Sequence, residues 1–196
     1  IVIYEHPHFF QDYNYNKKKL MLHRASMRYY YDYLKKSFKV TYVQFNQACD
    51  YTKMSKRSKY TIYDPLIKTS RLALGGEYEI FDTPNMLLSH VHFTQYREKT
   101  KNFFFNAFYM WSKKQLDIMP GVKSTDKMNR KTIPKNTPLP PVPNSKKNKY
   151  TKEASVYVEK HFPDNCGNCD NFIYPVTHTE ARAMLRDFIK NRISKF

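Results

Sequence analysis

The first candidate for a ligand site lies directly after the opening β-branched segment of the chain. Residues 1–5 are typical of a buried strand, and Glu5, His6, Phe9 and Asp12 stand at or just beyond its carboxyl end. Ligands of open α/β sheets bind in the crevice outside the carboxyl ends of the strands. These four side chains could therefore line a pocket for a small-molecule cofactor. An ordinary loop between a strand and a helix would show the same pattern.

The second candidate is a basic cluster in the segment that follows. Its members are Lys17, Lys18, Lys19, Arg24 and Arg28. Ammonium and guanidinium groups at this density could neutralise the phosphates of a nucleic acid and release counterions. A solvated helix face would also be basic, but the whole chain has 34 Lys and Arg against 17 Asp and Glu, a net charge of +17. This excess indicates a polyanionic partner.

Aromatic residues are interleaved with these basic ones. Tyr29, Tyr30 and Tyr31 are consecutive in a helical pattern, and tyrosine rings can stack on nucleic-acid bases. Packing within the fold, or an interface, is the alternative role. The helical phase can turn only some of the three rings inward, so at least one is left for a partner.

A CxxC pair at Cys166 and Cys169 has the spacing of half a zinc site or of a redox pair. A structural zinc would need two more ligands, for which Cys49, His161 and His178 are the candidates. No second pair is present, so the sequence favours cysteines that hold no metal. Three cysteines, an odd number, argue against a disulfide framework and fit a reducing cytosol or nucleus.

Other catalytic motifs are absent from the sequence. It has no Gly-rich phosphate loop, GxSxG, HExxH or paired-carboxylate motif, so nothing in it resembles a self-sufficient catalytic apparatus. A length of 196 residues suits one ordinary domain, and 41% hydrophobic residues suffice for a core. The apolar runs are far shorter than the roughly 18 residues of a membrane span. We expect a cytoplasmic protein, or one of the nucleoid or nucleus.

The elements that would position these residues alternate between strands and helices. We expect strands at 1–5, 40–45, 60–63 and 78–81, and an amphipathic helix over 16–37. A second helix should begin at Asp64-Pro65, with Asp as N-cap and Pro in the first helical position, and end at Gly75-Gly76. This order predicts an α/β fold with a Rossmann-like, mainly parallel sheet flanked by helices.

The second half of the chain has a different pattern. We expect an aromatic-faced helix over 101–118, a basic, Pro-rich linker, a short helix over 152–161 and a last helix. The last helix should open with a capping box at Thr177 and Glu180 and bury Ala181, Leu185 and Phe188. The predicted parts are therefore an α/β domain at 1–119, a linker at 120–150 and a helical region at 151–196.

Several segments, taken in order, carry the pattern of one family. They are Tyr4-Glu5-His6-Pro7, His23-Arg24-Ala25-Ser26-Met27, Thr83-Pro84-Asn85-Met86-Leu87-Leu88, Phe108-Tyr109-Met110-Trp111, Asp126-Lys127-Met128-Asn129-Arg130 and Val158-Glu159-Lys160-His161-Phe162-Pro163-Asp164-Asn165. Together they resemble the deoxyribodipyrimidine photolyase-related proteins, the branch of the photolyase/cryptochrome superfamily that includes the iron–sulfur bacterial photolyases. Within this resemblance Asp126, Asn129 and Arg130 are the matched family-motif residues.

The resemblance implies that the α/β domain binds a light-harvesting antenna chromophore, a lumazine or a flavin-type pigment. In the family, FAD, the iron–sulfur cluster and most of the DNA lesion site lie on a separate C-terminal helical domain, which we expect this chain to lack. DNA becomes the natural polyanion. The implied function is support of light-dependent DNA repair or photoreception, by holding the chromophore and docking a flavin domain, with no lyase activity of the chain alone.

Two departures from the family pattern leave an alternative open. The family has a strand and loop upstream of Ile1 that contribute to the antenna site. Residues 122–126 read Val-Lys-Ser-Thr-Asp where the family commonly has Lys-Trp-Ser-Phe-Asp. The alternative is a pigment-free basic α/β module that binds nucleic acid or a protein partner.

Overall fold

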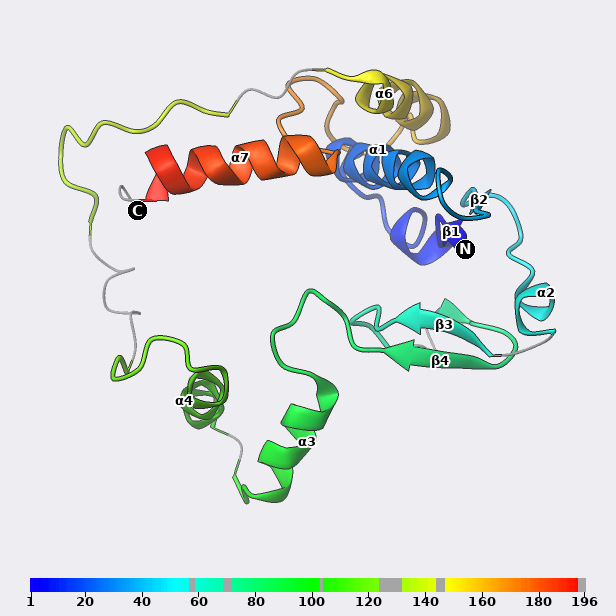
Figure 1. Ribbon diagram of the computed structural model, residues 1–196. Coiled ribbons are helices and arrows are strands. Elements are labelled where there is room, and N and C mark those ends of the chain that lie inside the picture. Colours follow the sequence, from blue (N-terminus) through cyan, green and yellow to red (C-terminus); the bar gives the residue numbers. More distant parts are fainter. Residues whose placement is uncertain (57–58, 69–71, 103, 124–131, 144–146, 194–196) are drawn as a thin grey trace. The chain divides into compact units, whose positions relative to one another are not determined.

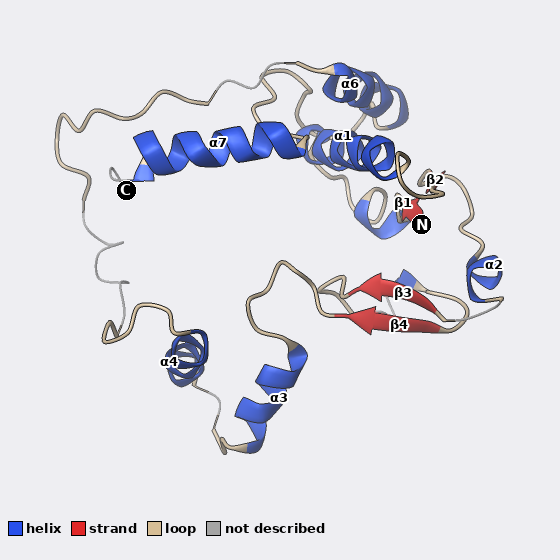
Figure 2. Ribbon diagram, in the orientation of Figure 1, coloured by secondary structure: helices blue, strands red, loops and turns tan. Residues whose placement is uncertain are grey.

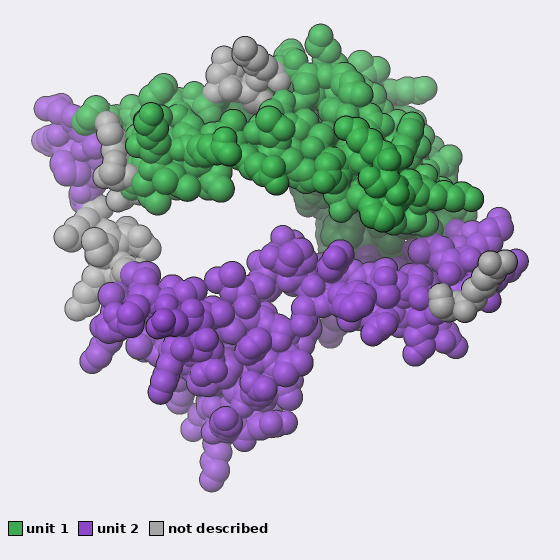
Figure 3. All heavy atoms as spheres, viewed as in Figure 1, with its two compact units in different colours: residues 1–49, 138–196 green, residues 50–137 purple. Residues whose placement is uncertain are grey.

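The computed structural model describes residues 1–56, 59–68, 72–102, 104–123, 132–143 and 147–193 (Figure 1). Its helices and short parallel strands place the chain in the α/β class, as predicted. The chain divides into two compact units, unit 1 with residues 1–49 and 138–196 and unit 2 with residues 50–137 (Figure 3). These boundaries differ from the predicted ones at 119 and 150, because helices from both ends of the chain pack together in unit 1.

Unit 1 contains the predicted first strand, helix and second strand. β1 (Val2–Tyr4) and β2 (Thr41–Val43), the two strands labelled near the N-terminus in Figure 2, pair in parallel. Tyr4 lies opposite Val43. A short 3-10 turn, η1 (Pro7–Phe9), leads from β1 toward α1 (Lys17–Leu34). A second parallel pair lies in unit 2, so the described strands form two parallel pairs and a Rossmann-like order stays a prediction.

The core of unit 1 lies between α1 and α6 (Lys149–His161). Leu20 and Ala25 of α1 meet Ala154 and Val158 of α6, and all four are fully buried. Met27 of α1 is only partly buried but also packs against this core. α6 packs on the face of α1 that carries Leu20 and Ala25.

The loop after α6 closes the start of α1. The backbone N–H of Lys17 donates to the carbonyl of Cys166 at 2.9 Å, and the side-chain amide of Asn165 donates to the carbonyl of Tyr15 at 2.8 Å. Asn16 is the N-cap, accepting from the backbone N–H of Lys18. The CxxC loop thus satisfies one of the donors that the first turn of a helix leaves unpaired, and Asn16 satisfies another.

Gly167 in this loop should resist substitution. Its φ is +84°, and a Cβ there would lie 2.6 Å from the side-chain nitrogen of Asn16, so the cap must move. We expect Gly167→Ala to lower the free energy of unfolding by about 2 kcal/mol, about half from backbone strain and half from the lost cap. Gly121→Ala is the control, because Gly121 has a φ of +78° with no atom within 4 Å of the added Cβ. Equal losses in urea denaturation would show that the cap contributes nothing.

Unit 2 holds the other two predicted strands. β3 (Tyr60–Tyr63) and β4 (Tyr78–Phe81) pair in parallel, accompanied by α2 (Tyr51–Ser55), α3 (His90–Glu98) and α4 (Phe105–Leu116). The prediction of α4 over 101–118 is confirmed in its central part, and α3 was missed.

The helix predicted between Asp64 and Gly75 is wrong at residues 64–68 and 73–75, which form turns and irregular backbone, while Leu72 is in a 3-10 turn. The carboxylate of Asp64 accepts from the backbone N–H of Leu66, two residues on, and Leu66 has a φ of 61°. Asp64 therefore closes a turn and does not cap a helix. Residues 69–71 of the predicted helix lie outside the described residues.

α7 (His178–Asn191) begins with the predicted capping box of Thr177 and Glu180. Its predicted inward face is wrong: no residue of α7 is buried, and Leu185 and Ile189 are 58% and 55% exposed. Between α4 and α6, the described residues form no helix or strand. Nowhere in the described ranges is a helix both long enough and apolar enough to cross a membrane.

Candidate functional site

Glu5 is the centre of a buried polar network at the carboxyl end of β1. Its side chain is fully buried and accepts four hydrogen bonds. Oε1 accepts from Arg24 Nη1 at 2.8 Å and from the Tyr42 hydroxyl at 2.5 Å. Oε2 accepts from the Tyr157 hydroxyl at 2.8 Å and from the backbone N–H of Phe45 at 3.2 Å. The network joins β1, α1, the end of β2 and α6 through one carboxylate.

Arg24 links this centre to the surface. Its Nη2 lies 2.5 Å from Oε1 of Glu153 on α6, and its guanidinium lies 3.8 Å from the ring centroid of Tyr157. Burial disfavours the charge of Arg24, but the hydrogen bonds to Glu153 and Glu5 outweigh it and raise its pKa above the ordinary value. The guanidinium therefore stays charged and holds two carboxylates from different elements.

Tyr42 and Tyr157 stay protonated in this setting. Burial, followed by the neighbouring Glu5 carboxylate, raises the pKa of both hydroxyls above the ordinary value. Both tyrosines therefore act as hydrogen-bond donors to Glu5. Four hydrogen-bond donors, one of them a charged guanidinium, replace the water that the Glu5 carboxylate loses on burial.

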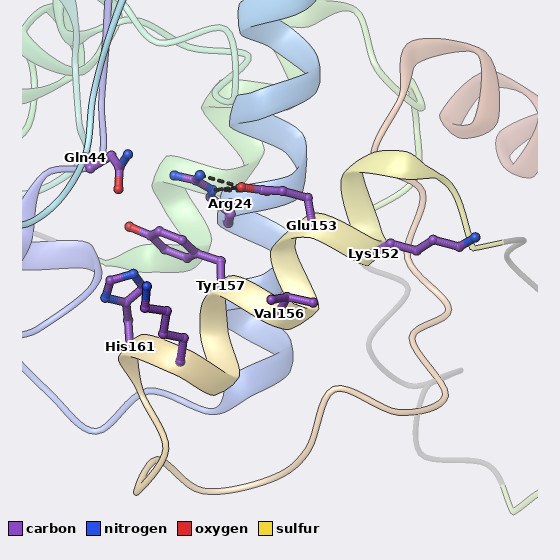
Figure 4. Close-up of a pocket in the computed structure, with 8 residues that line it drawn as sticks. Arg24, Gln44, Lys152, Glu153, Val156, Tyr157 and His161 are labelled. Atoms are coloured by element: carbon purple, nitrogen blue, oxygen red, sulfur yellow. Dashed lines mark hydrogen bonds and ion pairs between the residues drawn. The ribbon is translucent and has the colours of Figure 1, made fainter.

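A pocket of about 490 Å³ lies beside the network, on the α6 side of unit 1 (Figure 4). Its wall includes Arg24 and Glu153, and the rings of Tyr157 and His161 have centroids 4.5 Å apart. In Figure 4, Tyr157 and His161 point from α6 toward Gln44, the residue that follows β2. Lys152, Val156 and Lys160 complete the lining. The pocket thus combines aromatic surface, one amide and several cations at the carboxyl end of the β1–β2 pair.

The residues predicted to bind a cofactor lie near this point but take separate roles. Each carboxylate oxygen of Glu5 already accepts two hydrogen bonds from the protein, so Glu5 offers no open acceptor to a ligand. Nδ1 of His6 accepts the backbone N–H of His8, and Asp12 lies 2.5 Å from Nδ1 of His8. Phe9 packs against the core. Of the four, none lines the pocket.

The basic residues predicted to bind DNA divide into two groups. Lys17 and Arg24 are buried, and Lys17 pairs with Glu159 at 2.8 Å, so neither offers an open charge to a phosphate. Lys18, Lys19 and Arg28 form no ion pair with any other described residue. Lys19 lies 3.8 Å above the ring of Tyr15, and Arg28 lies 4.7 Å from that of Tyr42. These three remain candidates for phosphate contacts.

The remaining predicted residues are the three family-motif residues and the CxxC cysteines. Asp126, Asn129 and Arg130 lie outside the described residues. Cys166 is exposed and Cys169 is buried, both with free thiols. The described part of the chain contains no group of three or more His, Cys, Asp or Glu side chains that could hold a metal ion.

Sequence reasoning found the position of Glu5 but missed most of its partners. Tyr42 was noted only as a strand residue, and Tyr157, Gln44 and His161 were not linked to the first strand. Tyr157 lies 152 residues from Glu5 in the sequence, and its hydroxyl reaches Glu5 only because α6 packs on α1. The one available signal was a charged residue directly after a β-branched strand, which requires a buried partner.

Two comparisons bear on the identity of the chain. Among curated proteins none matched. A model of the family of deoxyribodipyrimidine photo-lyase-related proteins matches residues 1–174. The match includes unit 2, unit 1 as far as residue 174, the Glu5 network and the pocket beside it, and it ends before α7. The chain belongs to the deoxyribodipyrimidine photolyase-related protein family.

Proposed function

We propose that this chain supports light-dependent DNA repair or photoreception by holding an antenna chromophore in unit 1 and docking a flavin domain. The observation that carries the proposal is the pocket of about 490 Å³ at the carboxyl end of the β1–β2 pair. Its volume is within the range of small-molecule sites, and its place is where open α/β sheets bind ligands. Membership of the photolyase-related family supports a light-absorbing ligand.

The lining of the pocket fits a planar heteroaromatic pigment. The rings of Tyr157 and His161 provide flat surface, and the Gln44 amide could donate to a ring carbonyl or accept from a ring N–H. Lys152 and Lys160 would favour a pigment with electron-rich oxygens. When bound, such a pigment would absorb light and pass excitation energy to a flavin. The buried Glu5–Arg24 network would keep this wall rigid.

The exposed stripe of α7 supports docking of a second, helical domain. Ala181, Leu185 and Ile189 are exposed on one face, although their spacing is typical of a buried one. A contiguous exposed apolar stripe on a helix is commonly an interaction surface. A flavin domain, on the same or another chain, is the partner that the family implies.

Filling the pocket should abolish pigment binding. We expect Gln44→Trp to lower the affinity for a lumazine or riboflavin at least about tenfold, because the indole would occupy the space between Gln44 and His161. The measurement is quenching of pigment fluorescence on titration with protein. Gln11→Trp is the control, because Gln11 is exposed in the same unit and lies outside the pocket. If the two variants had equal affinity for the pigment, the pigment would not bind in this pocket.

A pigment-free basic module that binds nucleic acid is the second candidate. The specific observation is that Lys18, Lys19 and Arg28 have no carboxylate partner among the described residues, on a chain of net charge +17. A salt titration of DNA binding distinguishes it: phosphate contacts predict a steep fall of log affinity with log salt. Binding that does not change with salt would reject this candidate.

A further inference from the structure

The carboxyl-terminal half of α1 carries a cluster of tyrosines that stays partly exposed. The rings of Tyr30 and Tyr33 are stacked, with centroids 6.2 Å apart and planes 14° apart. Tyr29 stacks on Tyr33 at the same centroid distance. Tyr30 and Tyr33 are 45% and 48% exposed. Two adjacent aromatic side chains therefore present nearly half of their surface to solvent.

His178, the first residue of α7, fixes these rings from one side. Its imidazole lies edge-on to Tyr33, Tyr29 and Tyr30, with centroid distances of 5.0, 5.2 and 6.2 Å and interplanar angles of 86°, 89° and 76°. Tyr29 also meets Tyr150 of α6 edge-on at 5.6 Å. The rings are thus held in place by α6 and α7, so they lose little further conformational entropy when a ligand stacks on them.

Basic residues continue from this cluster along α7. Arg182 and Arg186 follow His178 at intervals of four residues, which places all three on neighbouring positions of one helix face. Both arginines are exposed, and neither forms an ion pair within the described residues. Lys36, three residues after Tyr33, is exposed as well.

The acidic groups nearby are already occupied. Asp32 accepts from Lys149 and from the Tyr150 hydroxyl, each at 3.1 Å, and these bonds lower its pKa although burial opposes the shift. Glu180 accepts from Asn148 and from the backbone at the start of α7. The open charges around the tyrosines are therefore positive.

We propose that Tyr30 and Tyr33, held by His178 and flanked by Arg182 and Arg186, form a stacking platform for single-stranded nucleic acid. A base would stack on the exposed tyrosine pair, and the phosphates on either side would lie along the arginines of α7. Aromatic platforms beside a basic track are how proteins bind single strands without reading sequence. A duplex hides its base faces, so it would meet only the charges. This inference rests on the nucleic-acid candidate above and is independent of the pigment pocket.

The test compares three labelled probes with the wild-type chain by fluorescence anisotropy. They are an oligothymidylate of about 12 nucleotides, the same length of abasic sugar-phosphate strand, and a duplex. We expect the oligothymidylate to bind at least about fivefold more tightly than the abasic strand, the lower end of the stacking contribution of one base. Equal affinity for the two strands overturns the platform and leaves the nucleic-acid candidate standing. Binding to none of the three overturns both.

Variants locate the platform on the chain. Tyr30→Ala with Tyr33→Ala should remove the preference for bases, and Tyr30→Phe with Tyr33→Phe should keep it, because the rings remain. Tyr13→Ala is the control, since Tyr13 is 63% exposed and lies apart from the platform. A base preference that survives the double alanine change, in protein with an unchanged circular dichroism spectrum, overturns the assignment. The probe comparison uses unmodified protein, so it decides the question even if a variant fails to fold.

The salt dependence of binding tests the two arginines of α7 separately from the tyrosines. Arg182→Gln with Arg186→Gln should reduce the salt slope of oligothymidylate binding by about 1.4, since each phosphate contact on a single strand contributes about 0.7. Lys99→Gln with Lys101→Gln removes two exposed charges from unit 2 and should leave the slope unchanged. A slope that both double variants change equally would contradict a basic track on α7.

Discussion

Arg24→Met should lower the free energy of unfolding by about 3–5 kcal/mol in urea denaturation followed by circular dichroism. The change removes the cation that pairs with Glu5 and leaves a fully buried carboxylate without its charge partner. Breaking a buried ion pair from one side has this cost because the remaining charge stays desolvated. Glu153 loses the same partner but is 43% exposed, so water can solvate it.

The control for Arg24 is Arg28→Met, one turn along the same helix. Arg28 makes cation–π contacts with Tyr31 and Tyr42 but no ion pair with a described residue, and we expect a loss of about 1 kcal/mol or less. Glu5→Leu combined with Arg24→Met should recover only part of the stability. Both buried charges are then gone, but the hydroxyls of Tyr42 and Tyr157 and the N–H of Phe45 lose their acceptor. If Arg24→Met lowered the free energy of unfolding no more than Arg28→Met does, the buried Glu5 carboxylate would not need the Arg24 guanidinium for its stability.

Phe10→Ala should cost about 3–5 kcal/mol, the usual range for a buried phenylalanine. Phe10 is 1% exposed, and its ring stacks on Phe45 with centroids 6.0 Å apart and planes 7° apart. It also meets Phe162 at 6.4 Å and the ring of His23 at 5.9 Å. The ring thus joins the loop after β1 to the segment after β2 and to the end of α6.

Phe38→Ala provides the matched comparison for Phe10. Phe38 is 57% exposed, and the same truncation there should change the free energy of unfolding by no more than about 0.5 kcal/mol. Because Phe10 holds the loop after β1, next to Glu5, Phe10→Ala should also lower the affinity of the pocket for a pigment. If Phe10→Ala and Phe38→Ala lowered the free energy of unfolding by similar amounts, Phe10 would not belong to the core of unit 1.

The strands could be predicted from the sequence because their residue types are local signals. Tyr60–Tyr63 and Tyr78–Phe81 are short β-branched and aromatic runs, and both strands were predicted with the bounds observed. The capping box of α7 was predicted for the same reason, since Thr177 and Glu180 bond to backbone within one turn. Signals of this kind require no knowledge of distant parts of the chain.

Two kinds of prediction failed: those that chose between two local roles of a residue, and those that depended on tertiary packing. Asp64-Pro65 looks like a helix start, but the carboxylate of Asp64 bonds to the N–H of Leu66 and closes a turn. α7 has the periodicity of a buried helix, yet none of its residues is buried, so periodicity shows an apolar face without showing what covers it. The sequence also could not show that Arg24, placed among basic residues, turns toward Glu5 and Glu153.

The candidate site, too, could be predicted only where its signal is local in the sequence. Glu5 was found as a polar residue at the carboxyl end of a strand, a position that the local pattern defines. The pocket itself was not, because Gln44 follows β2 while Tyr157 and His161 come from α6, more than a hundred residues later. Only the packing of α6 on α1 brings these side chains to one edge.

We propose that the pocket bounded by Gln44, Tyr157 and His161 holds a planar pigment. The most direct test is equilibrium dialysis of the purified chain against a lumazine, with riboflavin in parallel. We expect saturable binding of one pigment per chain, lost in Gln44→Trp and retained in Gln11→Trp. Absence of saturable binding for both pigments, or binding that Gln44→Trp leaves unchanged, would contradict it.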